Sequence, residues 1–429
     1  MSTELINTII SKIPQNWMID RIKHQVEDKP YSIVDGPFGT QLHNDEYVDE
    51  GVPVIRIVNL NYNGRFDPEK LVFITEEKYQ SLKRSSVEEG DLIIAKTGAT
   101  IGKVGVFEGY EKGIIASSCL KVSLNNNISP DFFKYYLISD YCQKQIMLSS
   151  SGSTRDTINM DQISNLQLVL PQNIITQQQI ANYLDKQIAK IDETITKNQQ
   201  LLELLEEKRV ALFNQKIIDI EYESIKLKDV LKIGGYIRGP FGSSLKRDEL
   251  KYEGIPVYEQ QHAIHNSRDF RYFIDRDKFK ELIRFKTYPN DLIISCSGTV
   301  GKISIISDDD PIGIISQALL ILRIDDKKIL PKFLSYFLSS HKGHDYLVSE
   351  SNGTAQVNIS QKDIINKIPI KLPPMDTQKE IVDELEHLNL RFNKIINKVN
   401  ENINLLEEYK TSLIHHVVTG KIDISGEEI

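Results

Sequence analysis

GDLIIAKTGATIGKVGV, residues 90–106, returns two hundred residues later as NDLIISCSGTVGKISI, residues 290–305. Each copy has an apolar run, turn glycines and a second apolar run, a pattern typical of a β-hairpin. The likeness extends to both sides at offsets of 199–203 residues. The other matching pairs are GPFGTQL (36–42) with GPFGSSL (239–245), EGVPVIRI (50–57) with EGIPVYEQ (253–260), ISPDFFKYYLIS (128–139) with ILPKFLSYFLSS (329–340), TQQQI (176–180) with TQKEI (377–381), and LLEEKRVALF (204–213) with LLEEYKTSLI (405–414). The chain is therefore a tandem duplication.

Each half of the duplication is predicted to be a small α/β domain that leads into a long helix. A short helix is expected with Ser129 as its N-cap and Pro130 at its first position, and Pro331 repeats the proline. Strand-like runs at 166–171 and 368–374 end at proline, and a long helix follows each. Apolar runs bounded by turn residues predict the strands of the first half, which are Val52–Val58, Leu71–Ile74, Leu92–Ala95, Val104–Phe107, Ile114–Ala116 and Leu120–Leu124.

The two long helices carry the heptad pattern of a coiled coil, with seam residues that step by four and three. Because both seams have the same register, we expect the helices to pair with each other, antiparallel if the repeats are related by a pseudo-two-fold axis. The polar seam members Asn198, Arg209, Asn389 and Lys410 are candidates for fixing the register. The complete seams are Leu184, Ile188, Ile191, Ile195, Asn198, Leu202, Leu205, Arg209 and Leu212, and Leu385, Asn389, Phe392, Ile396, Val399, Ile403, Leu406, Lys410 and Leu413.

Composition is that of an ordinary globular protein, with 429 residues, 40% hydrophobic and 26% charged, and length alone suits two or three domains. The net charge of −8 argues at first against nucleic acid, but residues 226–375 carry a net +5 while the helical stretches are acidic. No apolar run approaches a membrane span and the first residues lack a signal pattern, so we expect a cytoplasmic protein. Cys119, Cys142 and Cys296 are widely spaced, which favours reduced, buried thiols over a disulfide or zinc site.

Catalytic signatures are weak throughout the sequence. GATIGK (98–103) and SGTVGK (297–302) resemble part of a phosphate-binding loop. The first glycine is one residue too close, however, and Val104 or Ile303 stands where a hydroxyl should follow. We therefore expect hairpin turns there. No dinucleotide fingerprint and no metal spacing of histidines is present, and we predict that this chain is not an enzyme.

The assembled motifs resemble the specificity subunits of type I restriction-modification systems over essentially the whole chain. The resemblance is carried by IPQNW (13–17), the PFGxxL turn, EGxPV, the DLII…G…GK hairpin, the LP…TQxxI entry to each long helix, and VVTGKI (417–422). It implies an α/β fold of two tandem, pseudo-symmetric target-recognition domains separated by two long helices that pair as an antiparallel coiled coil. The expected segments are a first recognition domain at 1–175, a helical spacer at 176–223, a second recognition domain at 224–375 and a C-terminal helical spacer at 376–429.

The resemblance also implies what the chain binds. Each recognition domain would read one half of a split site in double-stranded DNA, and the helices would set the gap between the halves. Two methyltransferase subunits and motor-nuclease subunits are the expected partners. S-adenosylmethionine, ATP and Mg²⁺ are expected on those partners, with no cofactor in this chain and no membrane contact.

Residues at probable base-reading positions differ between the two halves, as where Arg56 aligns with Glu259. Arginine suits guanine, asparagine and glutamine suit adenine, and glutamate suits the cytosine amino group. Lys103 and Lys302 occupy one repeated position and are expected to contact phosphates. The DNA-binding candidates are Arg56, Asn59, Lys96, Thr97, Lys103, Ser117, Arg155, Glu259, Gln260, Gln261, His262, Ser295, Ser297, Lys302, Gln317 and Gln356.

Three alternatives remain open at this stage. The chain would be an enzyme if it has a catalytic site of an unrecognised kind. It would be a coiled-coil scaffold if it binds only protein. It would serve a fused nuclease-methyltransferase if its partner is a single polypeptide.

Overall fold

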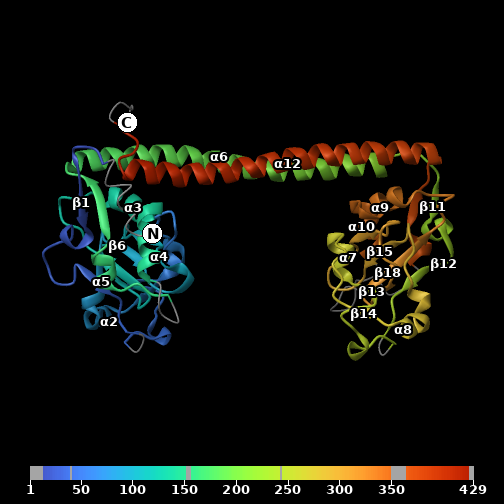
Figure 1. The fold of residues 1–429 in the computed structure, drawn as a ribbon, viewed down its shortest axis with the longest axis horizontal. Coiled ribbons are helices and arrows are strands. Elements are labelled where there is room, and N and C mark those ends of the chain that lie inside the picture. The colour runs from blue at the N-terminus through green and yellow to red at the C-terminus, as the bar shows by residue number, and fades with distance from the viewer. Residues whose placement is uncertain (1–12, 39–40, 151–155, 242–243, 349–363, 425–429) are drawn as a thin grey trace. The chain divides into compact units, whose positions relative to one another are not determined.

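The computed structural model describes residues 13–38, 41–150, 156–241, 244–348 and 364–424. Contacts divide the chain into two compact units, residues 1–198 with 400–429 and residues 199–399. The long helices α6 (Ile174–Ile218) and α12 (Met375–Val418) each contribute to both units (Figure 1). Each unit therefore combines one α/β domain with a segment of each long helix.

The first unit is built around two small sheets. One has the strand order β2-β9-β6-β7 and the other has the order β4-β3-β8-β5, in which β3 and β8 run parallel. A third pairing joins β1 to β10, close to the start of α6. The strands are β1 (Trp17–Arg21), β2 (Ile33–Asp35), β3 (Val52–Ile55), β4 (Val72–Ile74), β5 (Ser86–Glu88), β6 (Leu92–Ala95), β7 (Val104–Val106), β8 (Lys112–Ile115), β9 (Cys119–Val122) and β10 (Gln167–Pro171).

The second unit repeats this topology. Its sheets have the orders β12-β18-β15-β16 and β14-β13-β17, and β13 and β17 again run parallel. An isolated bridge between Lys286 and Ile314 takes the place of the fourth strand in the second sheet. The strands are β11 (Ser224–Lys226), β12 (Leu231–Arg238), β13 (Ile255–Tyr258), β14 (Phe273–Ile274), β15 (Leu292–Ser295), β16 (Ile303–Ile305), β17 (Ile314–Ile315), β18 (Leu319–Ile324) and β19 (Pro369–Lys371), of which β11 pairs with β19.

Short helices connect and cover these sheets. Ser129 caps α3 (Pro130–Ile138) by accepting a hydrogen bond from the backbone N–H of Phe132, and Pro331 begins α9 (Pro331–Ser339), as the sequence predicts. The remaining helices are α2 (Glu76–Ser81), α4 (Asp140–Ser150), α5 (Met160–Ser164), α7 (Gln260–His265), α8 (Arg276–Glu281), α10 (His341–Val348) and α11 (Ile364–Lys367).

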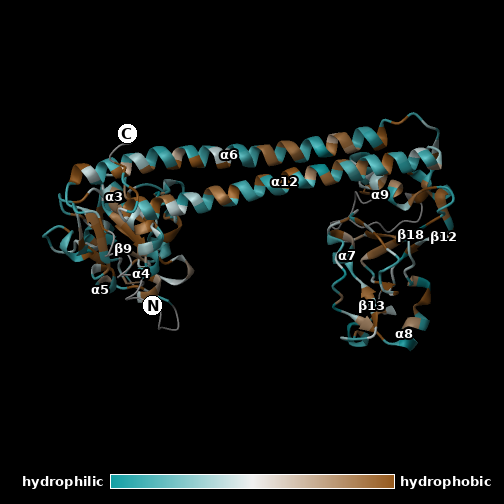
Figure 2. Ribbon diagram, turned by 45° about the horizontal axis from the view of Figure 1, so that its top comes forward, coloured by the Kyte–Doolittle hydropathy of each residue, from teal (hydrophilic) through white to brown (hydrophobic). Residues whose placement is uncertain are grey.

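The long helices pair antiparallel inside each unit, which confirms the prediction from their seams. In the first unit Lys410 Nζ lies 2.6 Å from Asp192 Oδ1. In the second, Arg209 donates to Asn393 at 3.4 Å and Lys216 pairs with Glu384, so residue numbers fall along α12 as they rise along α6. Apolar and polar residues alternate along both helices in Figure 2, because each helix turns its apolar side toward its partner helix or an α/β domain and its polar side toward solvent.

The core of the first unit draws on distant parts of the chain. Ile188 and Ile191 of α6 lie in one hydrophobic cluster with Val417 and Val418 at the end of α12 and with the strand residue Leu168. Just beyond α12, Gly420 lies so close to Pro14 that an added Cβ would be 2.7 Å from the proline ring. Segments from both ends of the described chain therefore complete the first unit and its core.

Differences from the sequence-based elements are small. The strand predicted at Val52–Val58 ends at Ile55, because the chain turns into a 3₁₀ segment at Ile57–Asn59. In the first half, the strands β1, β2 and β5 and the helices α2, α4 and α5 were not predicted. In the part of the chain that the structure describes, every helix falls short of the length and apolarity that a membrane span requires.

Candidate DNA interface

The ends of three strand segments meet at one place in the first unit. The backbone N–H of Ala116 donates to the Ile55 carbonyl at 2.8 Å, and that of Lys96 donates to the Ser118 carbonyl at 3.0 Å. These bonds bring together the residues that follow β3 and β6 and the turn between β8 and β9. The predicted residues Arg56, Lys96, Thr97 and Ser117 all belong to these three segments.

We call these three segments, the residues that follow β3 and β6 and the turn between β8 and β9, the backbone frame. The second unit repeats this frame. The Ser316 N–H donates to the Tyr258 carbonyl at 2.8 Å, and the Cys296 N–H donates to the Ala318 carbonyl at 2.8 Å. The segments that carry Glu259, Gln260, Ser297 and Gln317 are therefore adjacent, as the repeat predicts. The frame is common to both units, whereas the side chains on it differ.

The first glycine of each repeated GPFG sequence packs directly against this frame. Gly36 and Gly239 donate from their backbone N–H groups to the carbonyls of Cys119 and Leu319 at 3.1 and 3.0 Å. An added Cβ at Gly36 would lie 2.0 Å from the Ala116 carbonyl oxygen, and one at Gly239 would lie 2.0 Å from that of Ser316. Only glycine allows this approach, because it has no Cβ. This requirement explains why a glycine occurs at the same position in both repeats.

Side chains of the first unit's frame are partly held by neighbours. Arg56 lies over the Tyr47 ring at 5.9 Å and donates from Nη2 to the Lys70 carbonyl at 2.7 Å. Lys96 Nζ lies 3.0 Å from Asp35 Oδ1, and Ser117 is exposed. The surface here offers one arginine, one paired lysine and a free hydroxyl.

The hairpin glycines confirm the predicted turns. Gly98, Gly102, Gly298 and Gly301 all have positive φ, between +63° and +84°, and join antiparallel strand pairs β6–β7 and β15–β16. Both GK segments are therefore hairpin turns. The lysine that follows each turn differs in its surroundings, since Lys103 Nζ lies 5.5 Å from the centre of the Tyr62 ring and Lys302 is exposed.

A hollow of about 490 Å³ lies on the frame of the second unit. Four predicted residues line it, namely Glu259, Gln260, Gln261 and Gln317, and the sequence reasoning missed Arg247 and Arg271. Arg271 reaches the hollow because β14 pairs antiparallel with β13 in the register Ile255↔Ile274 and Pro256↔Phe273. This register brings Arg271, two residues before β14, close to the end of β13, where its guanidinium contacts Glu259. The two strands are joined by the long connection between Tyr258 and Phe273, so no local sequence pattern predicts their pairing. The hollow is also lined by Leu245, Leu250, Val257, Tyr272, Ser316 and Ala318.

Three predicted base contacts need correction, because their side chains are buried and bonded inside the domains. The Asn59 carboxamide accepts from the Arg56 N–H and donates to the Asp67 carbonyl, both at 2.9 Å. Ser295 Oγ accepts from the backbone N–H of Lys302 at 2.9 Å. Both side chains are fully buried, so they shape the frame and have no face left for a base.

His262 is the third correction. Its ring is fully buried, accepts a hydrogen bond at Nδ1 from the Glu259 backbone N–H at 2.7 Å, and stacks on Phe270 with ring centres 4.7 Å apart. Burial lowers the pKa of this imidazole, and hydrogen bonds to nearby backbone groups only partly offset that effect. His262 is therefore a neutral core residue that fixes the backbone at Glu259.

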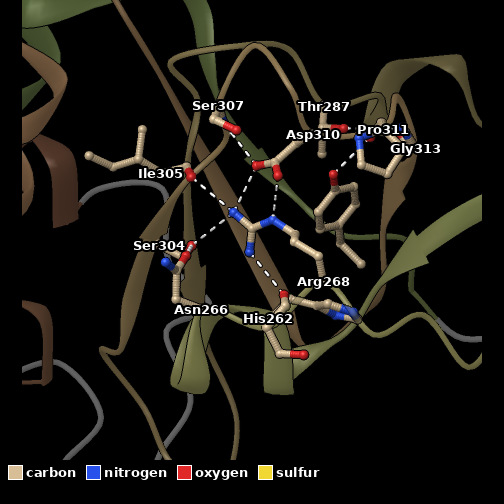
Figure 3. A network of polar contacts seen from close by, with 12 residues as sticks. His262, Asn266, Arg268, Thr287, Ser304, Ile305, Ser307, Asp310, Pro311 and Gly313 are labelled. Carbon is tan, nitrogen blue, oxygen red and sulfur yellow. Dashed lines mark hydrogen bonds and ion pairs between the residues drawn. The ribbon is translucent and has the colours of Figure 1, made fainter.

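Arg268 anchors the loop that leads to Arg271. Figure 3 shows its guanidinium at the centre of a polar network in which Nε and Nη2 each donate to the Asp310 carboxylate at 2.8 Å. Nη2 also donates to the Ile305 carbonyl at 3.0 Å and to Ser304 Oγ at 3.3 Å. The network ties the loop after α7 to the β16 strand and to the turn beyond it.

Two predicted residues, Arg155 and Gln356, lie outside the described residues. The segment that follows Arg155 is described and runs beside the first hairpin. The Gly98 N–H donates to the Asp156 carbonyl at 2.9 Å, and the Ile158 N–H donates to the Lys96 carbonyl at 3.0 Å. The described residues that follow Arg155 therefore lie next to the frame of the first unit.

Comparison with known proteins follows the same division of the chain. The family model for the type I restriction modification DNA specificity domain matches residues 39–204 and again residues 219–405. The chain belongs to this family. The two matches correspond to the two halves of the duplication, and each contains one copy of the frame described above.

Two relatives named as specificity subunits have low sequence identity to this chain, but the similarity covers most of both chains. The specificity subunit of the type I restriction enzyme StySPI from Salmonella potsdam is 23% identical over 393 residues, covering 87% of this chain and 83% of that protein. The EcoKI specificity subunit from Escherichia coli is 22% identical over 430 residues, covering 96% of this chain and 90% of that protein.

Solved structures share the fold. A chain from a study of complex assembly and conformational transition in the type I R-M system has a TM-score of 0.73 and 16% identity, covering 96% of this chain and all of that one. The HsdS subunit from Thermoanaerobacter tengcongensis has a TM-score of 0.61 and 16% identity, covering 96% of this chain and 98% of that one. The architecture that the resemblance implies, two α/β domains with two paired long helices, is confirmed.

Proposed function

We propose that this chain is the DNA specificity subunit of a type I restriction-modification complex, in which each α/β domain reads one half of a bipartite site. One observation carries the proposal. The same backbone frame appears in both units, and it bears different polar side chains at equivalent positions, such as Arg56 against Glu259 and Ser117 against Gln317. A conserved frame with exchanged polar groups suits two readers of unlike sequences.

The exposed chemistry of the frames fits the major groove. Arginine donates two hydrogen bonds to guanine, glutamine pairs with adenine, and glutamate accepts from the cytosine amino group. Lys103 and Lys302, at the end of each hairpin turn, are proposed to neutralise phosphates, a contact that positions a domain without selecting sequence. The remaining candidates Lys96, Thr97, Gln260, Gln261 and Ser297 lie on the same segments and would contribute through side chain or backbone.

The helices are proposed to set the gap between half-sites and to dock two methyltransferase subunits. A spacer must resist sliding, and the cross-helix pairs Asp192–Lys410 and Arg209–Asn393 oppose a shift of one helix along the other. A heptad inserted into only one helix would break these pairs, whereas matched heptads in both helices would restore the seam.

Catalysis is proposed to reside in the partners, where S-adenosylmethionine, ATP and Mg²⁺ would bind, with motor-nuclease subunits performing cleavage. The GK segments of this chain support the assignment, because they are hairpin turns packed on α4 and α10 and not phosphate loops. The thiols of Cys119 and Cys296 support it as well, since burial raises the pKa of each to about 12 and removes them as nucleophiles.

The chain's net charge of −8 implies that partners also supply part of the phosphate neutralisation.

The proposal is tested by expressing the chain with its cognate methyltransferase subunit in a host without DNA methylation, then sequencing the genome for methylated adenine. We expect one bipartite motif with two unlike half-sites and a fixed gap. The matched control is the methyltransferase expressed alone, which should leave the genome unmodified.

The opposite result is equally specific. A complex that assembles and binds S-adenosylmethionine, yet neither methylates nor retains any DNA in a binding assay, would identify a protein scaffold and refute the DNA-reading role.

A further inference from the structure

Glu259 and Arg271, which line the hollow in the second unit, form a bidentate ion pair. Nη2 of Arg271 donates to Oε1 of Glu259 at 2.8 Å, and Nε donates to Oε2 at 3.2 Å. The glutamate side chain is 18% exposed and the arginine side chain 63% exposed. The pair therefore faces solvent mainly through its guanidinium, with the carboxylate beside it.

Both members of the pair are held by rigid neighbours. The Glu259 backbone N–H donates to the buried ring of His262 at 2.7 Å, which fixes the point from which the carboxylate extends. Arg271 follows the Arg268–Asp310 anchor, its guanidinium lies 5.0 Å from the centre of the Tyr272 ring, and the Tyr272 carbonyl accepts from the Val257 N–H at 2.9 Å. An arrangement held in this way loses little side-chain entropy when it binds a ligand.

The pair matches one base pair by the order of its polar groups. In the major groove a G·C pair presents two acceptors, N7 and O6 of guanine, followed by the N4 amino donor of cytosine. Arg271 offers further N–H donors, and Glu259 keeps lone pairs beside them, so the pair presents donors followed by an acceptor. An A·T pair presents a donor between its two acceptors and would leave one of these charged groups unmatched.

We infer that Glu259 and Arg271 act together to read a single G·C pair in the half-site of the second unit, with Arg271 on guanine and Glu259 on the amino group of its cytosine. This inference rests on the proposed function and adds the identity of one base pair. The described residues of the first unit hold no such pair, because Arg56 stands at the position of Glu259 and donates to the Lys70 carbonyl. The reading is thus specific to one half-site.

The test compares methylation motifs of the complex carrying wild-type chain, Glu259→Gln, Arg271→Lys or Arg271→Gln. Glu259→Gln keeps the shape of the side chain and removes its charge. Arg271→Lys keeps the positive charge and removes the bidentate hydrogen-bonding geometry of the guanidinium. Lys280→Gln is the matched control, since Lys280 is exposed on α8, pairs with Asp277 and lies outside the hollow. Thermal unfolding of each purified chain establishes that the variants fold.

The expected result is that every Glu259 and Arg271 variant loses discrimination at one G·C position, the same in each, by about tenfold or more. The other positions of that half-site, the other half-site and the gap should be unchanged, and Lys280→Gln should give the wild-type motif. The inference is overturned if the folded variants keep the wild-type preference at every position, or if they relax different positions. Failure of the proposed function looks different, because the wild-type complex would then yield no motif.

Discussion

The side-chain carbonyl of Gln177 accepts a hydrogen bond from the backbone N–H of Ser129 at 2.8 Å, linking the start of α6 to the start of α3. The same carboxamide donates to the carbonyls of Asn127 and Pro171. Gln378 repeats the arrangement in the second unit, where it accepts from the Leu330 N–H at 2.8 Å and donates to the carbonyls of Lys328 and Pro373. Both glutamines are fully buried, so the TQ of each repeat is a structural joint between domain and helix.

Gln177→Ala should therefore destabilise the first unit by about 2–4 kcal/mol, because three backbone groups lose a buried partner. Gln378→Ala should have a similar effect on the second unit. Urea unfolding followed by far-UV circular dichroism measures both. Gln179→Ala, at an exposed neighbouring position of α6, is the control and should leave the midpoint unchanged. Equal midpoints for the Gln177 and Gln179 variants would show that the joint contributes nothing.

Gly36→Ala should be costly for a steric reason. The new Cβ would lie 2.0 Å from the Ala116 carbonyl oxygen, and since both partners are backbone, the turn must move away from the frame. We expect a loss of at least about 2 kcal/mol in stability and weaker discrimination in the first half-site. Gly98→Ala meets no atom within 4 Å and carries only the strain of φ +63°, about 1 kcal/mol. An equal effect of the two changes in the unfolding assay would contradict the steric explanation.

Asp310→Asn should weaken the second unit by about 2–4 kcal/mol, because the Arg268 guanidinium would lose its charged partner in a half-buried place. Burial tends to raise the pKa of Asp310, but hydrogen bonds from Arg268 and the Ser307 backbone outweigh it and hold the pKa below its ordinary value. This stabilisation is complete above the pKa of the unfolded carboxyl and is lost as pH falls through the folded value. Asp309→Asn, which removes an exposed charge one residue away, should unfold like the wild type at every pH.

His415→Asn should reduce the sensitivity of the first unit to acid. Burial, followed by the nearby charges of Lys421 and His416, lowers the pKa of His415 to about 4, and Nε2 lies 3.0 Å from Lys421 Nζ. The folded state therefore holds the neutral ring, and stability falls as pH drops from about 6.5 toward 4, by at most about 1.4 kcal/mol per pH unit for one proton. Asparagine is the natural comparison, because Asn214 occupies the equivalent position of α6.

Unfolding midpoints between pH 7 and pH 4.5 measure this effect. The variant should show a shallower fall than the wild type, with His416→Asn as the control. Parallel curves for wild type and His415→Asn would mean that the buried imidazole is protonated without cost.

The repeat made most of the framework predictable. A hairpin, a proline-started helix and a heptad seam are local patterns, and each appears twice, so Ser129, Pro130, Pro331 and the seam residues are where the sequence places them. The short strands β1 and β2 escaped prediction because they owe their existence to partners far along the chain, β10 and β9. Patterns within a few residues carry no information on such pairings.

The interface was predictable in location and less so in its individual side chains. Polar residues after β3 and β13 suggested exposure, yet Asn59 and His262 turn back into their domains, where they satisfy backbone groups at the strand ends. Arg271 was missed for the converse reason, since its place beside Glu259 depends on the pairing of β13 with β14. Alignment of the repeats finds the frame, whereas hydrogen bonding decides which residues on it are free.

The closure of the first unit by both ends of the described chain has a consequence for synthesis on the ribosome. Residues 199–399 of the second unit form one continuous stretch, so that unit can mature as soon as its last residue emerges. The first unit is begun earlier but waits for Leu413, Ile414, Val417 and Val418, which complete its core. The half that is translated first is therefore the half that finishes folding last, and until then the apolar faces of Ile188 and Ile191 lack their permanent cover.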